Sequence, residues 1–417
     1  MNSEAAIIKD AQPAGQASRA TVVATVGVPA SRVASIDAYR GWVMLLMMGE
    51  VLEFRRVSGA FPQSGFWSFL ARHQSHVEWV GCSLHDLIQP SFSFLVGVAL
   101  PFSLMRRSTE GQPPWQRTLH AFWRALILVL LGVFLRSIGR RQTYWTFEDT
   151  LTQIGLGYGF LYMLALRGAR VQWAALVTLL LGYWLAFALY PLPGPGFDWH
   201  AAGARIDWSD NLTGFAAHWN KNTNFAWAFD TWFMNLFPRE ATFSNNNGGY
   251  STLSFIPTLA TMLLGLIAGR VLSSARSPQA KVRWLAIAGA VGLGTGLLLG
   301  TLGICPVVKR IWTPSWVLFS GGWCFILLAG FYLVMDLWKR RTWAFWLTVV
   351  GMNSIAAYLI AHLFEGFISQ ALPRHLGAGG FAIAGKPYEP LLHGAAVLLV
   401  EWLILLWMYR RKIFLRV

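Results

Sequence analysis

Polar residues that could carry out chemistry gather at the entrance to one apolar run. Residues 72–87 hold three histidines and two carboxylates directly before that run: His73, His76, His85, Glu78 and Asp86. An imidazole near neutral pH accepts and releases protons, which is what general acid–base catalysis needs. This grouping predicts a catalytic or binding site at the helix entrance. A purely structural histidine cluster is the alternative that stays open.

The same side chains were weighed as metal ligands. His73 and His76, three residues apart, offer enough donor atoms together with Glu78, His85 and Asp86. Their spacing matches no zinc template, because helix-borne histidine pairs usually come with a defined third ligand. We therefore expect no metal in this site.

Other polar residues lie within or at the start of apolar runs, where each needs a partner. Glu50 lies deep in the first run, and we expect its carboxylate to face a pocket and not the lipid. Asp37 and Arg40 are three residues apart and share a helix face, as an anchoring ion pair or as part of a pocket. Asn353 and Ser354 are likewise polar residues in an apolar run, the one near 343–364, and are expected to line a pocket or to contact other helices.

Composition identifies the elements that must position these residues. Of the 417 residues, 55% are hydrophobic and only 13% are charged, about half the share in soluble proteins. Ten runs are long enough to predict membrane-spanning helices, near 38–56, 84–105, 118–137, 150–167, 172–191, 251–270, 284–303, 314–336, 343–364 and 390–409. The predicted fold is an all-α polytopic transmembrane helix bundle of about ten spans, in one membrane domain over residues 35–412.

The net charge of +15 is not a nucleic-acid signal here. Lys and Arg lie in short clusters between apolar runs, which is typical of topology signals and lipid contacts. The positive-inside rule places both termini in the cytoplasm and residues 191–250 in a long extracytoplasmic loop. Arg136, Arg140 and Arg141 fall outside against this rule. Residues 1–34 are expected to form a disordered cytoplasmic tail.

The long loop is rich in Trp, Asn and Gly, a composition that suits sugar faces and hydroxyl groups. Asn246, within a run of three asparagines, is the candidate ligand-binding residue there. A structured cap without a ligand is the alternative.

Five short motifs then occur in order at or near the starts of helices. They cover residues 35–41, 76–90, 250–269, 309–316 and 351–354. Together they resemble the heparan-alpha-glucosaminide N-acetyltransferase family, and more closely its bacterial branch of multi-span proteins, over roughly residues 32–410.

The resemblance implies a transmembrane acetyltransferase that moves an acetyl group from cytosolic acetyl-CoA to an amino sugar or related glycan on the other side. The family's active histidine corresponds to His76, as a general base or as the carrier of the acetyl group, and both routes stay open. Asp86, Glu50 and Glu78 would tune or orient it. The remaining binding residues would be Asp37, Arg40, Trp79, Asn246, Asn353 and Ser354.

The chain departs from the family at a few positions. Glu50 stands where eukaryotic members have Asn, and Gln153 lies in a segment where relatives often have Gln-Arg-Ile-Gly. We expect no counterpart of the eukaryotic luminal domain, and therefore a bacterial envelope or recycled amino sugar as the substrate in place of lysosomal heparan. We also expect a bacterial inner membrane protein whose partners are a glycan and the bilayer, without nucleic acid. A homodimer is compatible with this architecture.

The rival interpretation is a transporter or permease for a small polar solute such as a sugar. Glu50, Asp86 and Glu401 would then be proton-coupling sites within the membrane.

Overall fold

The apolar runs form helices throughout the computed structural model, which describes residues 33–109, 111–377 and 379–415. The expected tail over residues 1–34 falls almost entirely outside these residues. The long helices are α1 (Ala34–Met48), α4 (Ile88–Thr109), α5 (Pro114–Ser137), α6 (Thr150–Ala165), α7 (Ala169–Ala188), α9 (Phe255–Ser273), α10 (Pro278–Thr301), α11 (Pro314–Tyr332) and α15 (Glu389–Arg410). Among the described residues the only bridge between extended segments joins Val80 and Val308, so the all-α prediction is confirmed.

Shorter elements complete the chain. They are η1 (Gly49–Leu52), α2 (Phe54–Ala60), α3 (Gly65–His73), η2 (His85–Leu87), η3 (Gly214–Trp219), α8 (Phe225–Phe233), η4 (Met234–Leu236), η5 (Thr252–Ser254), η6 (Leu333–Leu337), η7 (Thr342–Ala344), α12 (Phe345–Gly351), α13 (Ser354–Leu363), α14 (Glu365–Leu376) and η8 (Lys386–Tyr388).

The structure supports fewer spans than the sequence pattern predicts. Seven helices in the described part are long and apolar enough to cross a membrane, or eight if α12 and α13, which meet at a 65° bend, form one span. The predicted runs at 38–56 and 150–167 are helical, but α1 has 15 residues and α6 has 16. At 1.5 Å per residue such helices rise about 24 Å, less than the roughly 30 Å of a hydrocarbon core.

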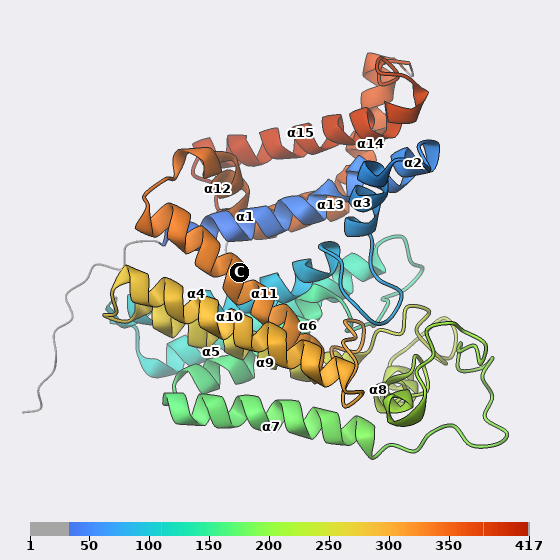
Figure 1. Cartoon of the computed structure of the whole chain (residues 1–417). Coiled ribbons are helices and arrows are strands. Elements are labelled where there is room, and N and C mark those ends of the chain that lie inside the picture. The colour runs from blue at the N-terminus through green and yellow to red at the C-terminus, as the bar shows by residue number, and fades with distance from the viewer. Residues whose placement is uncertain (1–32, 110, 378, 416–417) are drawn as a thin grey trace, which may run out of the picture. The chain divides into compact units, whose positions relative to one another are not determined.

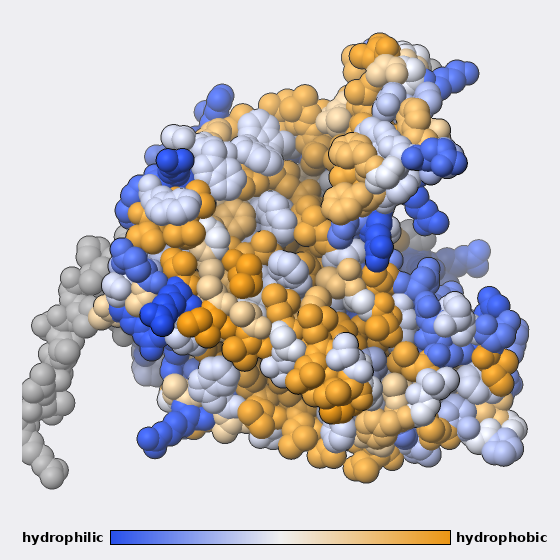
Figure 2. Space-filling model, viewed as in Figure 1, coloured by the Kyte–Doolittle hydropathy of each residue, from blue (hydrophilic) through white to orange (hydrophobic). Residues whose placement is uncertain are grey.

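The surface has the layering of a membrane protein. Figure 2 shows hydrophobic residues across the middle of the bundle, with hydrophilic residues gathered at its ends. Lys and Arg cluster where α4, α9, α11 and α15 end, the end that the positive-inside rule assigns to the cytoplasm. The candidate site and the 191–250 segment lie at the other end (Figure 1). The sidedness itself remains a prediction.

Close helix contacts fix the elements that carry the site. Along the bundle, α4 packs on α9, α5 on α6, α10 on α11 and α1 on α12 (Figure 1). A Cβ atom at Gly97 in α4 would collide with the backbone oxygen of Met262 in α9, and one at Gly394 in α15 would collide with that of Val51 in η1. Glycine is needed at both positions because the backbones touch, as in other membrane helix pairs.

Candidate active site

A turn before α4 holds Asp86 in a buried position. The Oδ2 atom of Asp86 accepts hydrogen bonds from the Ser83 amide (3.0 Å), the Ser83 hydroxyl (3.0 Å) and the Val77 amide (3.3 Å). The side chain is only 1% exposed. His73, from the predicted cluster, accepts a hydrogen bond from the Leu84 amide at 3.2 Å and so helps to shape the same turn.

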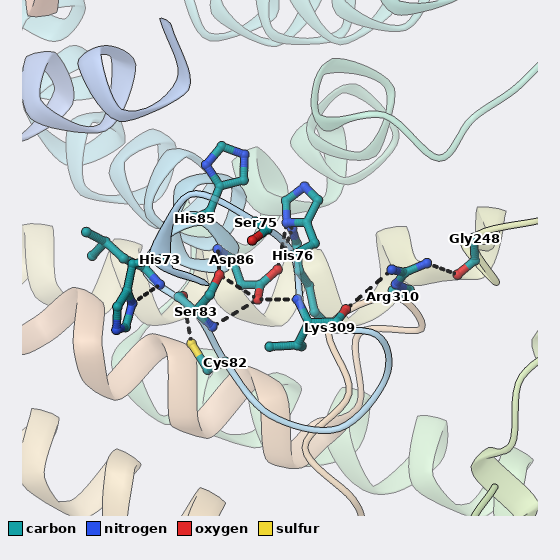
Figure 3. A network of polar contacts seen from close by, with 12 residues as sticks. His73, Ser75, His76, Cys82, Ser83, His85, Asp86, Gly248, Lys309 and Arg310 are labelled. Atoms are coloured by element: carbon teal, nitrogen blue, oxygen red, sulfur yellow. Dashed lines mark hydrogen bonds and ion pairs between the residues drawn. The ribbon is translucent and has the colours of Figure 1, made fainter. Parts of the chain in front are cut away.

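His76 faces Asp86 across this turn. Its Nδ1 atom lies 2.8 Å from Oδ1 of Asp86 (Figure 3). An ionised carboxylate can only accept, so in the tautomer that hydrogen-bonds to Asp86, Nδ1–H donates and Nε2 is left without a proton. Burial lowers the pKa of His76, and the nearby Lys309 charge lowers it further, whereas Asp86 acts in the opposite direction. The imidazole is therefore neutral near pH 7 and has a free lone pair.

Lys309 is the third member of this cluster. Its Nζ atom lies 3.1 Å from Oδ1 of Asp86 and 3.0 Å from Nδ1 of His76 (Figure 3). Lys309 was not among the residues predicted from the sequence, although it lies in the fourth motif, residues 309–316. A lysine shortly before α11, at the end predicted to face away from the cytoplasm, was the available signal.

A second acid–base pair lies beside the first. Glu50, in the 3₁₀ turn that continues α1, places Oε1 2.6 Å from Nε2 of His85. The rings of His76 and His85 have centroids 4.6 Å apart. The first and second apolar runs thus meet at this site, as the polar residues in both had indicated.

These groups line a cavity of about 600 Å³, a size typical of small-molecule sites. Its wall also includes Asn246 from the long loop, which donates to Oε2 of Glu148 at 2.6 Å. Burial raises the pKa of Glu148, and Arg136 opposes this shift. Arg136, which falls outside against the positive-inside rule, itself lines the cavity. Tyr358, His362 and Glu365 also line the cavity.

Several predicted binding residues do not line this cavity in the described part of the chain. Asp37 and Arg40 form a 3.5 Å ion pair early in α1. Asp37 is thirteen residues before Glu50, about 20 Å along a helix. Their role as substrate contacts stays a prediction.

The other predicted residues are placed as follows. Asn353 donates to the Ile413 carbonyl (2.8 Å) and accepts from the Leu415 amide (3.2 Å), which holds the end of the chain, and Ser354 begins α13 beside it. Trp79 is buried and donates to the Trp219 carbonyl at 3.1 Å, so it fastens the long loop. Glu78 is exposed.

Gln153, the departure from the family pattern, has a structural role. Its amide nitrogen donates to the carbonyls of Phe147 (2.6 Å), Thr252 (3.2 Å) and Ser251 (3.3 Å). The side chain therefore joins the segment before α6 to the start of α9.

Within the described residues, no group of three or more His, Cys, Asp or Glu side chains is arranged to hold a metal ion.

Comparisons with known proteins follow from this geometry. No family model matches the chain. The human heparan-alpha-glucosaminide N-acetyltransferase is 23% identical over 377 residues, which cover 81% of this chain and 53% of the human protein. The mouse enzyme of the same name is 21% identical over 378 residues, covering 81% of this chain and 54% of its own length. The chain thus spans about half the length of these relatives. The two matches make the chain a distant relative of the heparan-alpha-glucosaminide N-acetyltransferases.

Proposed function

We propose that this protein is a membrane acetyltransferase that transfers the acetyl group of acetyl-CoA to the amine of an amino sugar in the cavity. The observation that carries the proposal is the contact between buried Asp86 and His76, whose ring lines a cavity of about 600 Å³. The names of the two relatives supply the reaction class.

The imidazole can serve this reaction in two ways. As a base, Nε2 of His76 takes a proton from the acceptor amine, whose nitrogen attacks the thioester carbonyl. The carbon–sulfur bond then breaks, and the CoA thiolate leaves and takes up a proton. As a carrier, Nε2 attacks the carbonyl first, CoA leaves, and the acceptor amine then takes the acetyl group from the imidazole. Both routes need a neutral imidazole, which the lowered pKa of His76 favours.

The rest of the cavity suits an acceptor that carries an amine and hydroxyl groups. Carboxylates of Glu50, Glu148 and Glu365 are arranged around it and would attract an ammonium group. Asn246 donates one amide hydrogen to Glu148 and would offer the other to a sugar hydroxyl. We propose that acetyl-CoA enters from the cytosol. Arg and Lys residues cluster where α4, α9, α11 and α15 end, which is the end predicted to be cytoplasmic, and they suit the phosphates of CoA.

The test is acetyl transfer by the detergent-purified protein. Acetyl-CoA and a panel of amino sugars are mixed with the protein, and CoA release and the N-acetylated product are measured. We expect His76→Ala to lose at least a hundredfold in rate, the lower end of the range for a general base. His375→Ala, an exposed histidine late in α14, is the matched control and should keep the wild-type rate.

Acetylation of the peptide that contains His76, found by mass spectrometry after rapid quenching, would select the carrier route. Full activity in a folded His76→Ala protein would remove this residue from the mechanism. Absence of acetyl-CoA binding, together with donor-independent sugar uptake into proteoliposomes, would replace the proposal by a transport function.

A further inference from the structure

Lys309 is a buried ammonium group in direct contact with the imidazole of His76. Its side chain is 6% exposed, and its Nζ atom lies 3.0 Å from Nδ1 of His76 and 3.1 Å from Oδ1 of Asp86. Burial lowers the pKa of Lys309, because a buried charge is expensive, and the negative charge of Asp86 opposes this shift. Asp86 is therefore the anion that favours the charged form of Lys309.

The backbone around Lys309 is built to hold it there. Val308 forms an antiparallel bridge with Val80, and the Gly81 amide donates to the Val307 carbonyl at 3.0 Å. The next residue, Arg310, donates to the carbonyls of Gly248 (2.7 Å) and Val77 (3.3 Å), as Figure 3 shows for Gly248. The segments that carry His76 and Lys309 are therefore fastened to each other and to the long loop.

Asp86 has two effects on His76: it orients the ring through a hydrogen bond, and its negative charge favours the protonated imidazolium. The Nδ1 atom of His76 can donate to Asp86 or accept from Lys309, but it cannot do both at once. A carboxylate alone would orient the ring through Nδ1–H, and it would also draw a second proton onto Nε2 by its negative charge. The imidazolium so formed could neither accept a proton nor attack a carbonyl. Lys309 cancels that charge and leaves the orienting hydrogen bond in place.

Other charged groups around His76 do not supply this compensation in the described part of the chain. The His85 ring lies beside that of His76, tilted by 51°, and is itself paired with Glu50. The remaining ionisable groups that face the cavity are Arg136, Glu148, Asp149, Tyr250, Tyr358, His362 and Glu365. In the part of the chain that the structure describes, Lys309 is the cation within hydrogen-bond distance of the His76 imidazole.

We propose that Lys309 is a positioning residue that keeps His76 uncharged while Asp86 orients it. Its importance for acetyl transfer rests on the proposed function, but its effect on the charge of His76 does not. In the base route Lys309 leaves Nε2 free to take the proton of the acceptor amine. In the carrier route it also destabilises the positive charge of the acetylated imidazole, which favours transfer onward to the amine.

The test measures the charge state of His76 without any acyl donor. Diethylpyrocarbonate reacts with neutral imidazoles, so the rate of His76 modification against pH, followed by peptide mass spectrometry, gives the midpoint of its titration. Removing an adjacent positive charge shifts a pKa by about 1 to 3 units. We therefore expect Lys309→Met to raise the midpoint of His76 by at least one pH unit, and Lys309→Arg to keep it near the wild-type value. His375 in the same samples is the internal control.

Lys309→Met leaves Asp86 buried without its partner, which could prevent folding. A double variant keeps the inference testable in that case. Lys309→Met with Asp86→Asn removes both charges, and its midpoint should lie below that of Lys309→Met. A midpoint unchanged from wild type in Lys309→Met, or in the double variant a midpoint raised as far as expected for Lys309→Met alone, would overturn the inference. A shifted midpoint in a protein that transfers no acetyl group would uphold the inference and refute only the proposed function.

Discussion

Replacing Asp86 by asparagine is the most informative single change in this site. The carboxylate receives donors on both oxygens, from Ser83 and Val77 on one side and from Lys309 and His76 on the other. An asparagine of the same shape must turn its NH₂ group toward one of these sets. If it faces His76, Nδ1 becomes the acceptor and the proton moves to Nε2, where it blocks both catalytic routes. If it faces Ser83, an amide hydrogen meets donors that need an acceptor.

The magnitudes differ for activity and stability. Loss of a correctly placed general base lowers the rate by about 10² to 10⁴-fold, so Asp86→Asn should retain at most about 1% of the wild-type rate. The ammonium of Lys309 would also lose its buried counter-charge, and breaking such a pair by removing one partner costs about 3 to 5 kcal/mol. We expect a protein that still folds but melts at a clearly lower temperature.

The assay combines acetyl transfer with thermal unfolding followed by tryptophan fluorescence. Asp336→Asn is the matched control, because Asp336 also holds an arginine (Arg341, 3.2 Å) and a backbone amide (Ser35, 3.1 Å) but does not line the cavity. That control should lose stability and keep its activity per folded molecule. If Asp86→Asn retains more than a tenth of the wild-type rate when corrected for folded protein, the orienting role assigned to Asp86 is wrong.

Three further predictions concern residues outside the imidazole cluster. Burial raises the pKa of Asp230 to about 7. Between about pH 4 and pH 7 the folded chain therefore keeps a proton that the unfolded chain releases. The free energy of unfolding then falls by about 1.4 kcal/mol for each pH unit over this range. Asp230→Asn should lack this slope and exceed wild type in melting temperature by more at pH 8 than at pH 5, with the exposed Asp207→Asn as control; equal differences at the two pH values would contradict it. Gly394→Ala should push α15 away from the Val51 carbonyl and lower both melting temperature and activity, because Glu50 precedes Val51; an unchanged melting point would show that the helices do not touch. Glu401, fully buried with no hydrogen-bond partner on either oxygen in the described part, should gain about 1 to 3 kcal/mol of stability as methionine, and a loss of stability in unfolding assays would reveal a hidden partner.

The helices were the part of the structure that the sequence could predict well. Each of the ten predicted runs is helical, because long uncharged stretches leave the backbone no other way to satisfy its hydrogen bonds in a membrane. The number of spans was less accessible. Hydropathy does not show where α1 gives way to a 3₁₀ turn at Gly49, nor that the run near 343–364 bends between Gly351 and Ser354.

The site was only partly predictable, for a physical reason. His76, His85 and Asp86 lie close in sequence, so a single turn brings them together. Lys309 and Glu148 come from other connections, and their approach depends on how loops fold over the ends of the helices. Hydropathy cannot report that folding, because the loops contain few of the apolar patterns on which it relies.

Polar residues at helix ends also have more than one use. Trp79 and Gln153 lie beside the site in sequence or in the family pattern, but both use their polar atoms to fasten backbone segments. The sequence shows which side chain is present, but not whether that side chain contacts a ligand or holds backbone segments together.

The bridge between Val80 and Val308 implies that the cluster of His76, Asp86 and Lys309 can come apart while the helix bundle stays folded. A few backbone hydrogen bonds outside the apolar layer bring Lys309 to His76, whereas the bundle is held by extensive buried helix contacts. Regions held by few contacts open locally at a lower free-energy cost than global unfolding. In harsh detergent the protein should therefore pass through a state in which every helix is intact and the imidazole has lost its neighbours. Circular dichroism would count that state as native, and only the reactivity of His76 would reveal it.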